Sequence, residues 1–362
     1  MDIRAVDLFC GAGGLTNGLA KAGLRVVAGI DSDRACKYPF EANNLARFIL
    51  KGVEDLKPAE IVSLYGNAEY KVLAGCAPCQ AFSTYTQSEE KGRRSRWTLL
   101  ERFAELFEMV KPDVVTMENV WQLTAQPVFR QFLNRLTAAG YKTSYTRVDC
   151  REYGIPQSRI RLVLIASRHG DIAIPLPTHP GPKKWRTVRQ TIGKLPKLTH
   201  GSGDARDPIH VCSELSPINL KRIRASRAGG SWRDWPKDLR AKCHTKKTGK
   251  TYPGVYGRMR WEEPSPTITG QAFGFGNGRF GHPVQDRAIS LREAARLQTF
   301  PAKYKFARTK DDVSIKNVGR MIGNAVPPRL GKVIGLAIVA HLKGLKRRKS
   351  SKTSKNIRGH CD

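Results

Sequence analysis

Short apolar runs and helical patterns alternate through the first 166 residues of the chain. Continuous apolar runs bounded by turn residues predict strands at residues 3–9, 25–30, 70–74, 113–117 and 160–166. Apolar residues spaced three and four apart predict helices between them, most clearly at residues 99–110 and 128–139. Strands that alternate with helices imply an α/β fold with a mainly parallel sheet, which binds ligands at the carboxyl ends of its strands.

The pattern changes after Ser167. Prolines punctuate a basic and weakly periodic region that continues to about residue 281. This region predicts a second, smaller domain of loops and short strands. Helical spacing returns from Ser290, and a last helix is expected over residues 329–342. The residues from 346 onward are basic and poor in apolar side chains, which predicts a disordered tail.

The chain carries 63 Lys and Arg against 31 Asp and Glu, which gives a net charge of +32. An excess of this size indicates a polyanionic partner, most simply nucleic acid. The excess is concentrated, because residues 181–262 hold 20 basic against 6 acidic residues and residues 341–362 hold 8 against 1. An anionic membrane surface is the competing partner. However, no uninterrupted apolar segment is long enough to span a bilayer, and residues 1–4 do not begin a secretory signal.

A turn with two cysteines, Gly-Cys-Ala-Pro-Cys-Gln at residues 75–80, directly follows an apolar run. Cys79 is the candidate nucleophile, because open α/β sheets place their chemistry at the carboxyl ends of strands. Cys76 and Cys79 also form a C-x-x-C pair, for which a redox dithiol or half of a zinc site is the alternative. The other six cysteines are scattered singly. The sequence therefore predicts no metal site, and it favours a reducing, intracellular setting.

A glycine-rich segment at residues 7–14 lies between a predicted strand and a predicted helix, where the backbone can approach a ligand closely. Asp31 ends the next strand, 20 residues after Gly11, and is placed to accept hydrogen bonds from ribose hydroxyls. Asp55 is a candidate partner for an adenine amino group. The segment lacks the full G-x-G-x-x-G spacing, so it predicts an adenosine-type cofactor and leaves NAD and S-adenosylmethionine both open.

Glu118 ends a strand that is expected to lie beside the strand leading to Cys79. A buried carboxylate there could act as a general acid or bind a substrate nitrogen. Arg159 and Arg161 open the next strand on one face, because strand residues two apart share a face. Such a pair suits phosphate, carboxylate or a pyrimidine carbonyl, and a structural salt bridge is the alternative.

Taken in order and approximate spacing, these segments resemble the DNA (cytosine-5)-methyltransferases of bacteria and phages. The resemblance covers nearly the whole chain except the basic middle region and the tail. It rests on six motifs, at residues 7–14, 78–80, 118–120, 157–161, 296–301 and 323–328. The family usually has a small or apolar residue where Cys76 stands, and we expect Cys76 to be a free thiol and a bystander.

The resemblance implies a Rossmann-like S-adenosylmethionine-dependent methyltransferase domain with a smaller, irregular target-recognition domain. Cys79 would attack carbon 6 of a cytosine, and Glu118 would bind ring nitrogen 3 and the exocyclic amine. Arg161, with Arg159 behind it, would fix the base carbonyl and the surrounding backbone. The implied cofactor contacts are Phe9, Gly11, Gly13, Gly14, Asp31, Asp55, Pro78, Asn324 and Val326. S-Adenosylmethionine is the implied methyl donor, and no metal is expected.

The same resemblance divides the chain into four expected parts. These are a catalytic domain over residues 1–179, a target-recognition domain over 180–281, a hinge and return to the catalytic domain over 282–345, and the tail. The target cytosine must leave the stacked duplex to reach the thiol. Residues 91–96 supply a glycine and phosphate-binding charge for a loop that would close over the flipped base.

The implied partner is double-stranded DNA and not a membrane, with a cognate restriction endonuclease as a further candidate. A monomeric, cytoplasmic and nucleoid-associated enzyme of a bacterial or phage-infected cell is expected. The lack of a long regulatory region before the first motif favours a stand-alone bacterial or phage enzyme over a large eukaryotic one. Methylation of cytosine in RNA is the first alternative, but the Cys-Phe-Thr signature of the branch that acts on transfer RNA does not follow Glu118. A DNA-binding regulator on an inactive scaffold and an NAD oxidoreductase are further alternatives, and the complete set of motifs counts against both.

Overall fold

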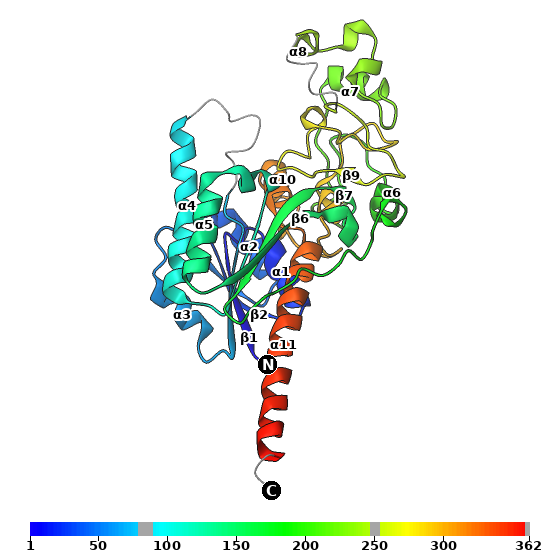
Figure 1. Cartoon of the computed structure of the whole chain (residues 1–362). Coiled ribbons are helices and arrows are strands. Elements are labelled where there is room, and N and C mark those ends of the chain that lie inside the picture. Colours follow the sequence, from blue (N-terminus) through cyan, green and yellow to red (C-terminus); the bar gives the residue numbers. More distant parts are fainter. Residues whose placement is uncertain (79–89, 247–253, 359–362) are drawn as a thin grey trace. The chain divides into compact units, whose positions relative to one another are not determined.

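The computed structural model describes residues 1–78, 90–246 and 254–358 of the 362-residue chain (Figure 1). The chain forms two compact units. The first unit takes Met1–Val148, Ile160–Leu176 and Leu330–Asp362, and the second takes Asp149–Arg159 and Pro177–Arg329. The backbone therefore passes from one unit to the other four times.

A seven-stranded sheet with the order β3-β2-β1-β4-β5-β8-β6 forms the centre of the first unit. Its strands are β1 Ile3–Leu8, β2 Arg25–Asp31, β3 Arg47–Leu50, β4 Tyr70–Gly75, β5 Val114–Asn119, β6 Lys142–Asp149 and β8 Ile160–Ser167. The first five strands pair in parallel, and β8 runs antiparallel to β5. The predicted α/β fold with a mainly parallel sheet is confirmed.

Two strands, β3 and β6, fall outside the predicted apolar runs. Both stand at the edges of the sheet, where only one side of the strand is paired. β3 has four residues, and most side chains of β6 are exposed or half-buried. An edge strand that buries few side chains does not need an apolar sequence, so the hydrophobic pattern carries no signal for it.

Side-chain alternation along β1 distributes the helices over the two faces of the sheet. Val6 and Leu8 pack in a core cluster with residues of α3, α4 and α5, whereas Asp7 between them bonds Thr16 of α1. The helices α3, α4 and α5 therefore cover one face and α1 the other, as Figure 1 shows. The helices of this unit are α1 Gly14–Lys21, α2 Lys37–Glu41, α3 Pro58–Tyr65, α4 Glu90–Val110, α5 Pro127–Ala138 and α11 Pro328–Arg358.

The long helix α11 packs closely on α1 at two glycines. A Cβ on Gly331 would lie 3.0 Å from the backbone oxygen of Leu15, and one on Gly335 would lie 2.6 Å from the Cβ of Ala22. A side chain at either position would therefore require α1 or α11 to shift locally, and the first half of α11 joins the core. Its buried residues are Leu330, Ile334, Ala337, Ile338 and Leu342.

Within the described part of the chain, Ile315–Leu345 is the one segment long and apolar enough to cross a membrane by length and composition. This is weak evidence, because 56% of its most apolar window is buried inside the protein and a core helix passes the same test. The segment is also interrupted, since α10 (Ile315–Asn324) ends before α11 begins at Pro328.

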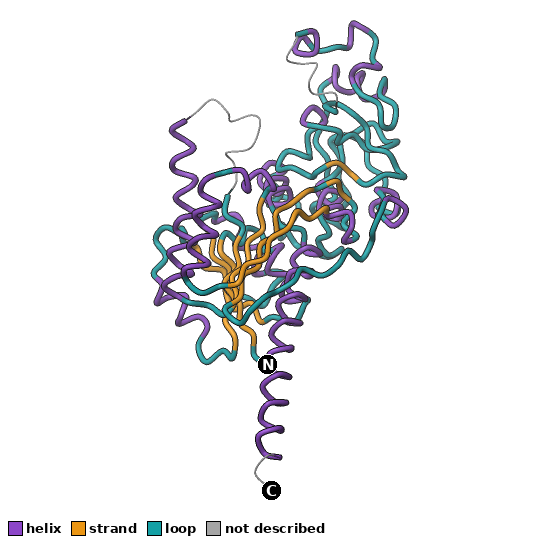
Figure 2. The backbone as a smooth tube through the Cα atoms, viewed as in Figure 1, coloured by secondary structure: helices purple, strands orange, loops and turns teal. Residues whose placement is uncertain are grey.

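The second unit consists mostly of loops (Figure 2). Its regular elements are short, namely β7 Gln157–Ser158, β9 Ser265–Pro266, α6 Val188–Ile192, α7 Pro217–Arg224, α8 Lys242–Thr245, α9 Leu291–Leu297 and α10. Its described apolar cluster is small and consists of Leu215, Ile223, Trp232, Trp235, Phe275 and Ala288. The predicted region of loops and short strands has this character in the structure.

Buried charged side chains stabilise the second unit where apolar ones are few. Arg287, which is fully buried, forms two hydrogen bonds of 2.7 and 2.8 Å with the carboxylate of Glu293. Arg258, 5% exposed, donates to the backbone oxygens of Ile223 and His282, among others, and pairs with Asp286. Buried charges are tolerated only when their hydrogen bonds are satisfied, so these networks fix the course of the loops.

The compact units differ from the four expected parts, and residues 149–159 and 177–179, expected in the catalytic domain, belong to the second unit. Residues 180–281, expected as the target-recognition domain, lie within the second unit, but residues 282–329 also belong to it. The reason is local packing, because α9 contacts α10 and the backbone nitrogens of Leu291 and Arg292 bond Val211 and Ile209. The tail expected to be disordered is helical in its backbone as far as residue 358, where it continues α11.

Candidate active site

The strand order reverses between β1 and β4, which is the switch point at which open α/β sheets bind ligands. The two strands pair in register from Ile3 with Tyr70 to Leu8 with Gly75, so they end side by side. The loops that leave them are the glycine-rich segment and the turn with two cysteines. Cys79, the predicted nucleophile, lies outside the described residues, and the described part of the turn ends at Pro78, which is exposed.

The loop after β1 has a backbone that suits a closely bound ligand. Phe9, Gly11 and Gly13 adopt φ values of 57°, 51° and 85°, in the left-handed region that favours glycine. Phe9 is not a glycine, and such strained residues concentrate at functional sites. A Cβ on Gly11 would meet no described atom within 4 Å, so this part of the loop borders open space. Gly14 is buried and begins α1.

Asp31 connects the end of β2 to this loop. Its Oδ2 accepts a hydrogen bond of 2.9 Å from the backbone nitrogen of Gly11, and its Oδ1 accepts one from the nitrogen of Asp33. A carboxylate oxygen can accept a second hydrogen bond, so these contacts leave the group able to bind hydroxyls. The predicted partners Gly11 and Asp31 are thus brought together.

Asp7 is a buried acid at the end of β1. Its Oδ2 accepts a 2.6 Å hydrogen bond from the Thr16 hydroxyl, and burial raises the pKa of Asp7 to about 7. Its Oδ1 is buried and has no hydrogen-bond partner among the described residues. Thr16 was not predicted for the site, although its position two residues after the glycines was a signal that it faces the loop.

Glu118 lies at the centre of a polar cluster at the carboxyl end of β5. The residue is 2% exposed. Nε of Arg161 on β8 lies 3.0 Å from its Oε1, and Sγ of Cys76 donates a 3.1 Å hydrogen bond to its Oε2. The predicted Glu118 and Arg161 are therefore in contact, and Cys76, expected to be a bystander, is part of the same cluster.

The sheet register explains how three separate segments meet. Gly75 is paired with Met117, so Cys76 follows β4 at the level of Glu118. Glu118 faces Val163 across the antiparallel pair, and Arg161 stands two residues along on the same face of β8. The carboxylate is thus held from the strands on both sides.

Asn119 is a further residue that was not predicted to act. It is 3% exposed, its Nδ2 donates to the backbone oxygen of Ala77 at 3.3 Å, and its Oδ1 accepts from the nitrogen of Val120 at 2.8 Å. The side chain therefore ties the end of β5 to the turn that leads to Pro78. Its place directly after Glu118 in the same motif was the available signal.

Arg159 does not join Arg161 at Glu118. The strand begins at Ile160, and Arg159 belongs to the second unit, where it is 3% exposed. Its guanidinium donates to the backbone oxygens of Ile268 at 3.2 Å and Ala325 at 3.4 Å. The expected pair on one strand face is therefore not formed, because the chain changes strand and unit between the two arginines.

The other predicted cofactor contacts, Asp55, Asn324 and Val326, lie in segments other than the glycine-rich loop and the Glu118 cluster. Asp55 is exposed in the turn that follows β3. Asn324, exposed, and Val326, 4% exposed, lie in the second unit at the end of α10. Gly323 beside them is required by packing, because a Cβ there would lie 2.0 Å from the backbone carbon of Thr269.

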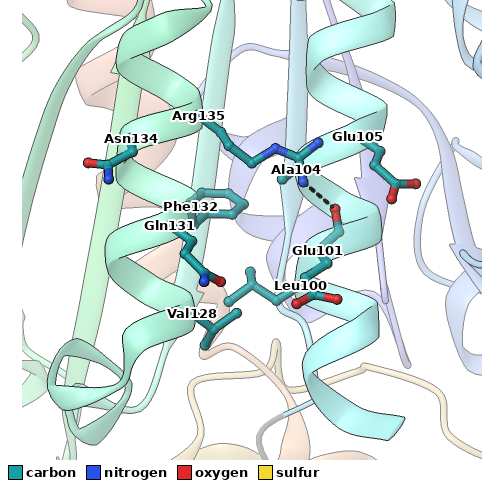
Figure 3. A pocket seen from close by; sticks show the side chains of 9 residues that line it. All are labelled: Leu100, Glu101, Ala104, Glu105, Val128, Gln131, Phe132, Asn134 and Arg135. Carbon is teal, nitrogen blue, oxygen red and sulfur yellow. Dashed lines mark hydrogen bonds between the residues drawn. The ribbon is translucent and has the colours of Figure 1, made fainter. Parts of the chain in front are cut away.

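A pocket of about 410 Å³ lies between α4 and α5, away from the predicted residues (Figure 3). Leu100, Val128 and Phe132 contribute its apolar lining, and Glu101 and Arg135 are among its polar residues. None of its lining residues belongs to the expected site. Among the residues that the structure describes, no group of three or more His, Cys, Asp or Glu is placed to hold a metal ion.

The comparisons with known proteins show the family to which the chain belongs. The family model described as C-5 cytosine-specific DNA methylase matches residues 3–340. The Type II methylase M.HgiDII of Herpetosiphon aurantiacus is 49% identical over 346 residues, which cover 95% of this chain and 97% of that protein. The Type II methyltransferase M.Eco47II of Escherichia coli is 32% identical over 353 residues, with coverages of 95% and 80%.

A solved structure shares the fold. It is a prophage-encoded protein of Escherichia coli described as a DNA modification methyltransferase, with a TM-score of 0.70 at 21% identity, covering 94% of this chain and all of that one. The fold is thus that of a Rossmann-like methyltransferase. The chain belongs to the C-5 cytosine-specific DNA methylase family, and it is a DNA (cytosine-5-)-methyltransferase.

Proposed function

We propose that the protein transfers a methyl group from S-adenosylmethionine to carbon 5 of a flipped cytosine in a specific double-stranded DNA sequence, through a covalent adduct with Cys79. One observation carries the proposal. The buried carboxylate of Glu118 is held by Arg161 at the end of β5, beside the turn of the chain that leads directly to Cys79. A fixed carboxylate next to a candidate thiolate matches what activation of a cytosine ring requires.

The chemistry proceeds through the thiolate. The Cys79 sulfur forms a bond to carbon 6, and the ring electrons move so that carbon 5 becomes nucleophilic. Glu118 binds ring nitrogen 3 and the exocyclic amine and stabilises the charge that develops on the ring. After carbon 5 has gained the methyl group, a base removes its proton, and the electrons of that bond expel the thiolate from carbon 6. Arg161 orients Glu118 and contacts the base carbonyl.

The first unit offers features that fit the methyl donor. The space beside Gly11 is open and could hold part of a ligand, whereas a side chain at this position would occupy that space. The Asp31 carboxylate suits the hydroxyls of a ribose. When bound there, S-adenosylmethionine supplies an electrophilic methyl group. Phe9 would pack against the ligand and Asp55 would bind its adenine amino group. Gly13, Gly14, Pro78, Asn324 and Val326 are the other contacts that the family resemblance assigns.

The charge distribution supports DNA as the substrate. Residues 181–262 hold 20 basic against 6 acidic residues, and this region would read base edges in the major groove. The loop expected over residues 91–96 was a wrong prediction, because these residues are helical and begin α4, Glu90–Val110. The bacterial Type II relatives support a cytoplasmic enzyme that works beside a cognate endonuclease. We propose that the enzyme acts as a monomer.

The test measures transfer of tritium from methyl-labelled S-adenosylmethionine to unmethylated plasmid and, in parallel, to transfer RNA. Wild type should label the plasmid and leave the RNA unlabelled, and Cys79→Ser should label neither. Bisulfite sequencing of the plasmid then gives the recognition sequence.

Each result has a distinct meaning. If wild type does not label the plasmid, the proposal is overturned. If it labels only the transfer RNA, the substrate is RNA and not DNA. Label that persists in Cys79→Ser would overturn the nucleophile. Glu118→Gln should retain the fold and lose about a hundredfold or more in rate, because the carboxylate acts at the developing charge.

A further inference from the structure

The residue before Ala77 is a cysteine, and in the structure its thiol lies beside the carboxylate of the predicted acid, Glu118. Its Sγ donates a 3.1 Å hydrogen bond to Oε2 of Glu118, while Arg161 holds Oε1 at 3.0 Å. Oε2 thus has a hydrogen-bond donor at the end of β4, whereas Oε1 has an ion-pair contact on β8 and no hydrogen bond among the described residues.

The two contacts do different things to the carboxylate. An ion pair to one oxygen anchors the group, but it leaves rotation about the last side-chain bond broad, because that torsion has only weak preferences. The Cys76 thiol donates to the second oxygen, Oε2, from the end of β4, on the other side of β5 from Arg161. This second contact fixes the plane of the carboxylate. Since a hydrogen bond to a substrate ring depends on direction, the fixed plane aims the remaining lone pairs.

A thiol is suited to this task. It is a weak donor, so it orients the oxygen without competing strongly with a substrate hydrogen bond. It also fits the space, since Cys76 is half-buried at the level of Glu118 in the sheet register.

We propose that Cys76 is a positioning residue that sets the carboxylate plane of Glu118 for the methyl-transfer reaction. The inference rests on the proposed function, because it assigns Cys76 a part in the step at which Glu118 binds the cytosine. Cys76 touches neither substrate nor cofactor in this role, and it acts only through Glu118.

The test compares three variants with wild type in steady-state methylation of plasmid DNA. Cys76→Ala and Cys76→Val both remove the donor, Ala with a smaller side chain and Val with a larger one. Both should lower kcat about three- to tenfold, while KM for S-adenosylmethionine and for DNA stays within about twofold. Cys76→Ser keeps a donor at nearly the same place and should restore most of kcat.

Cys150→Ala is the matched control. Its side chain is also a thiol, and it is buried in the second unit, outside residues 181–262 and outside the six motifs. It should leave kcat and both KM values unchanged. Melting temperatures identify any variant that fails to fold, and Cys76→Ser against Cys76→Ala remains a comparison of two side chains of similar size.

The outcomes separate the two proposals. If wild type does not methylate DNA, the proposed function fails before any variant is compared. If wild type is active and Cys76→Val equals it in kcat, the role of Cys76 is overturned and the proposed function stands. A rise in KM with unchanged kcat, or a Ser variant as slow as Val, would also overturn the positioning role.

Discussion

The two compact units are stabilised in different ways. The first buries a continuous apolar cluster between its sheet and the helices α3 to α5, and its polar groups gather at the carboxyl ends of the strands. The second has a small apolar cluster and relies on buried arginines, a histidine and a glutamate that bond one another and the loop backbone. An apolar core tolerates changes of shape that keep its volume, whereas a polar network requires particular atoms in particular places. The difference can be tested by substitution.

The largest effect is expected from breaking the buried pair of the second unit. Arg287→Met leaves Glu293, 1% exposed, as an uncompensated charge and should lower the free energy of unfolding by about 3–5 kcal/mol. Denaturant unfolding followed by tryptophan fluorescence is a suitable measurement, because Trp185, Trp232, Trp235 and Trp261 lie in this unit. Arg206→Met, at a side chain 81% exposed and paired with Asp204, is the control and should cost less than about 1 kcal/mol. Equal losses would contradict the role of the buried network.

In the first unit, volume should matter more than chemical identity. Leu136 is fully buried in the core cluster, so Leu136→Ala should cost about 2–5 kcal/mol through lost burial and a cavity. Leu136→Met keeps most of the volume and should cost less than about 1.5 kcal/mol. Circular dichroism of the helices during denaturant unfolding gives both values. The comparison would fail if the Met variant were as unstable as the Ala variant.

Acid should weaken the second unit and strengthen the first. Burial lowers the pKa of His282 to about 4, below its ordinary value of 6.5. The unfolded chain therefore takes up the proton first, and about 3 kcal/mol of stability present above pH 6.5 is lost as the pH falls toward 4. Asp7 has the opposite sign, because its folded pKa of about 7 lies above the ordinary 3.8. Its contribution is present below pH 4 and lost as the pH rises through 7.

Unfolding midpoints between pH 4 and pH 8 measure both slopes. His282→Asn should remove the loss of tryptophan-detected stability on acidification, and Asp7→Asn should remove the loss of helix-detected stability as the pH rises toward 7. A pH profile unchanged by His282→Asn would show that another group controls the acid response.

The smallest effect concerns the packing of α11 on α1. Gly335→Ala should cost about 1–3 kcal/mol, because the added carbon would lie 2.6 Å from the Cβ of Ala22. Gly344→Ala, in the same helix but with nothing within 4 Å of its Cβ, should instead stabilise by up to about 1 kcal/mol. Thermal melting of the two variants checks the signs, and two changes of the same sign would contradict the close packing.

The sequence predicted the first unit better than the second, because the interior of the first is mostly apolar, whereas that of the second contains several buried charged side chains. Strands β1, β2, β4, β5 and β8 are buried on both faces, so each appears in the sequence as an apolar run that predicts it. The second unit has few such runs, because Arg258 and Arg287 occupy its interior, and basic residues in a sequence ordinarily predict an exposed surface. Residues 282–329 were therefore not predicted to belong to it.

The candidate site also has residues that the sequence could predict and contacts that it could not. Glu118, Arg161, Gly11 and Asp31 could be predicted because motif order and strand ends place them at the carboxyl edge of the sheet. The contact of Cys76 with Glu118 could not, since it depends on the pairing of Gly75 with Met117, which is set across 42 residues of chain. The separation of Arg159 from Arg161 also depends on where β8 begins.

The sequence by itself determined the sheet strands that are buried on both faces, the family and the residue types of its chemistry. Periodicity and short motifs are local properties of a chain and survive without its fold. Only the tertiary structure decided which neighbours hold the Glu118 carboxylate, which arginine reaches it, and where the second unit ends. Those outcomes depend on register and on the satisfaction of buried charges, and both are set by residues distant in the sequence.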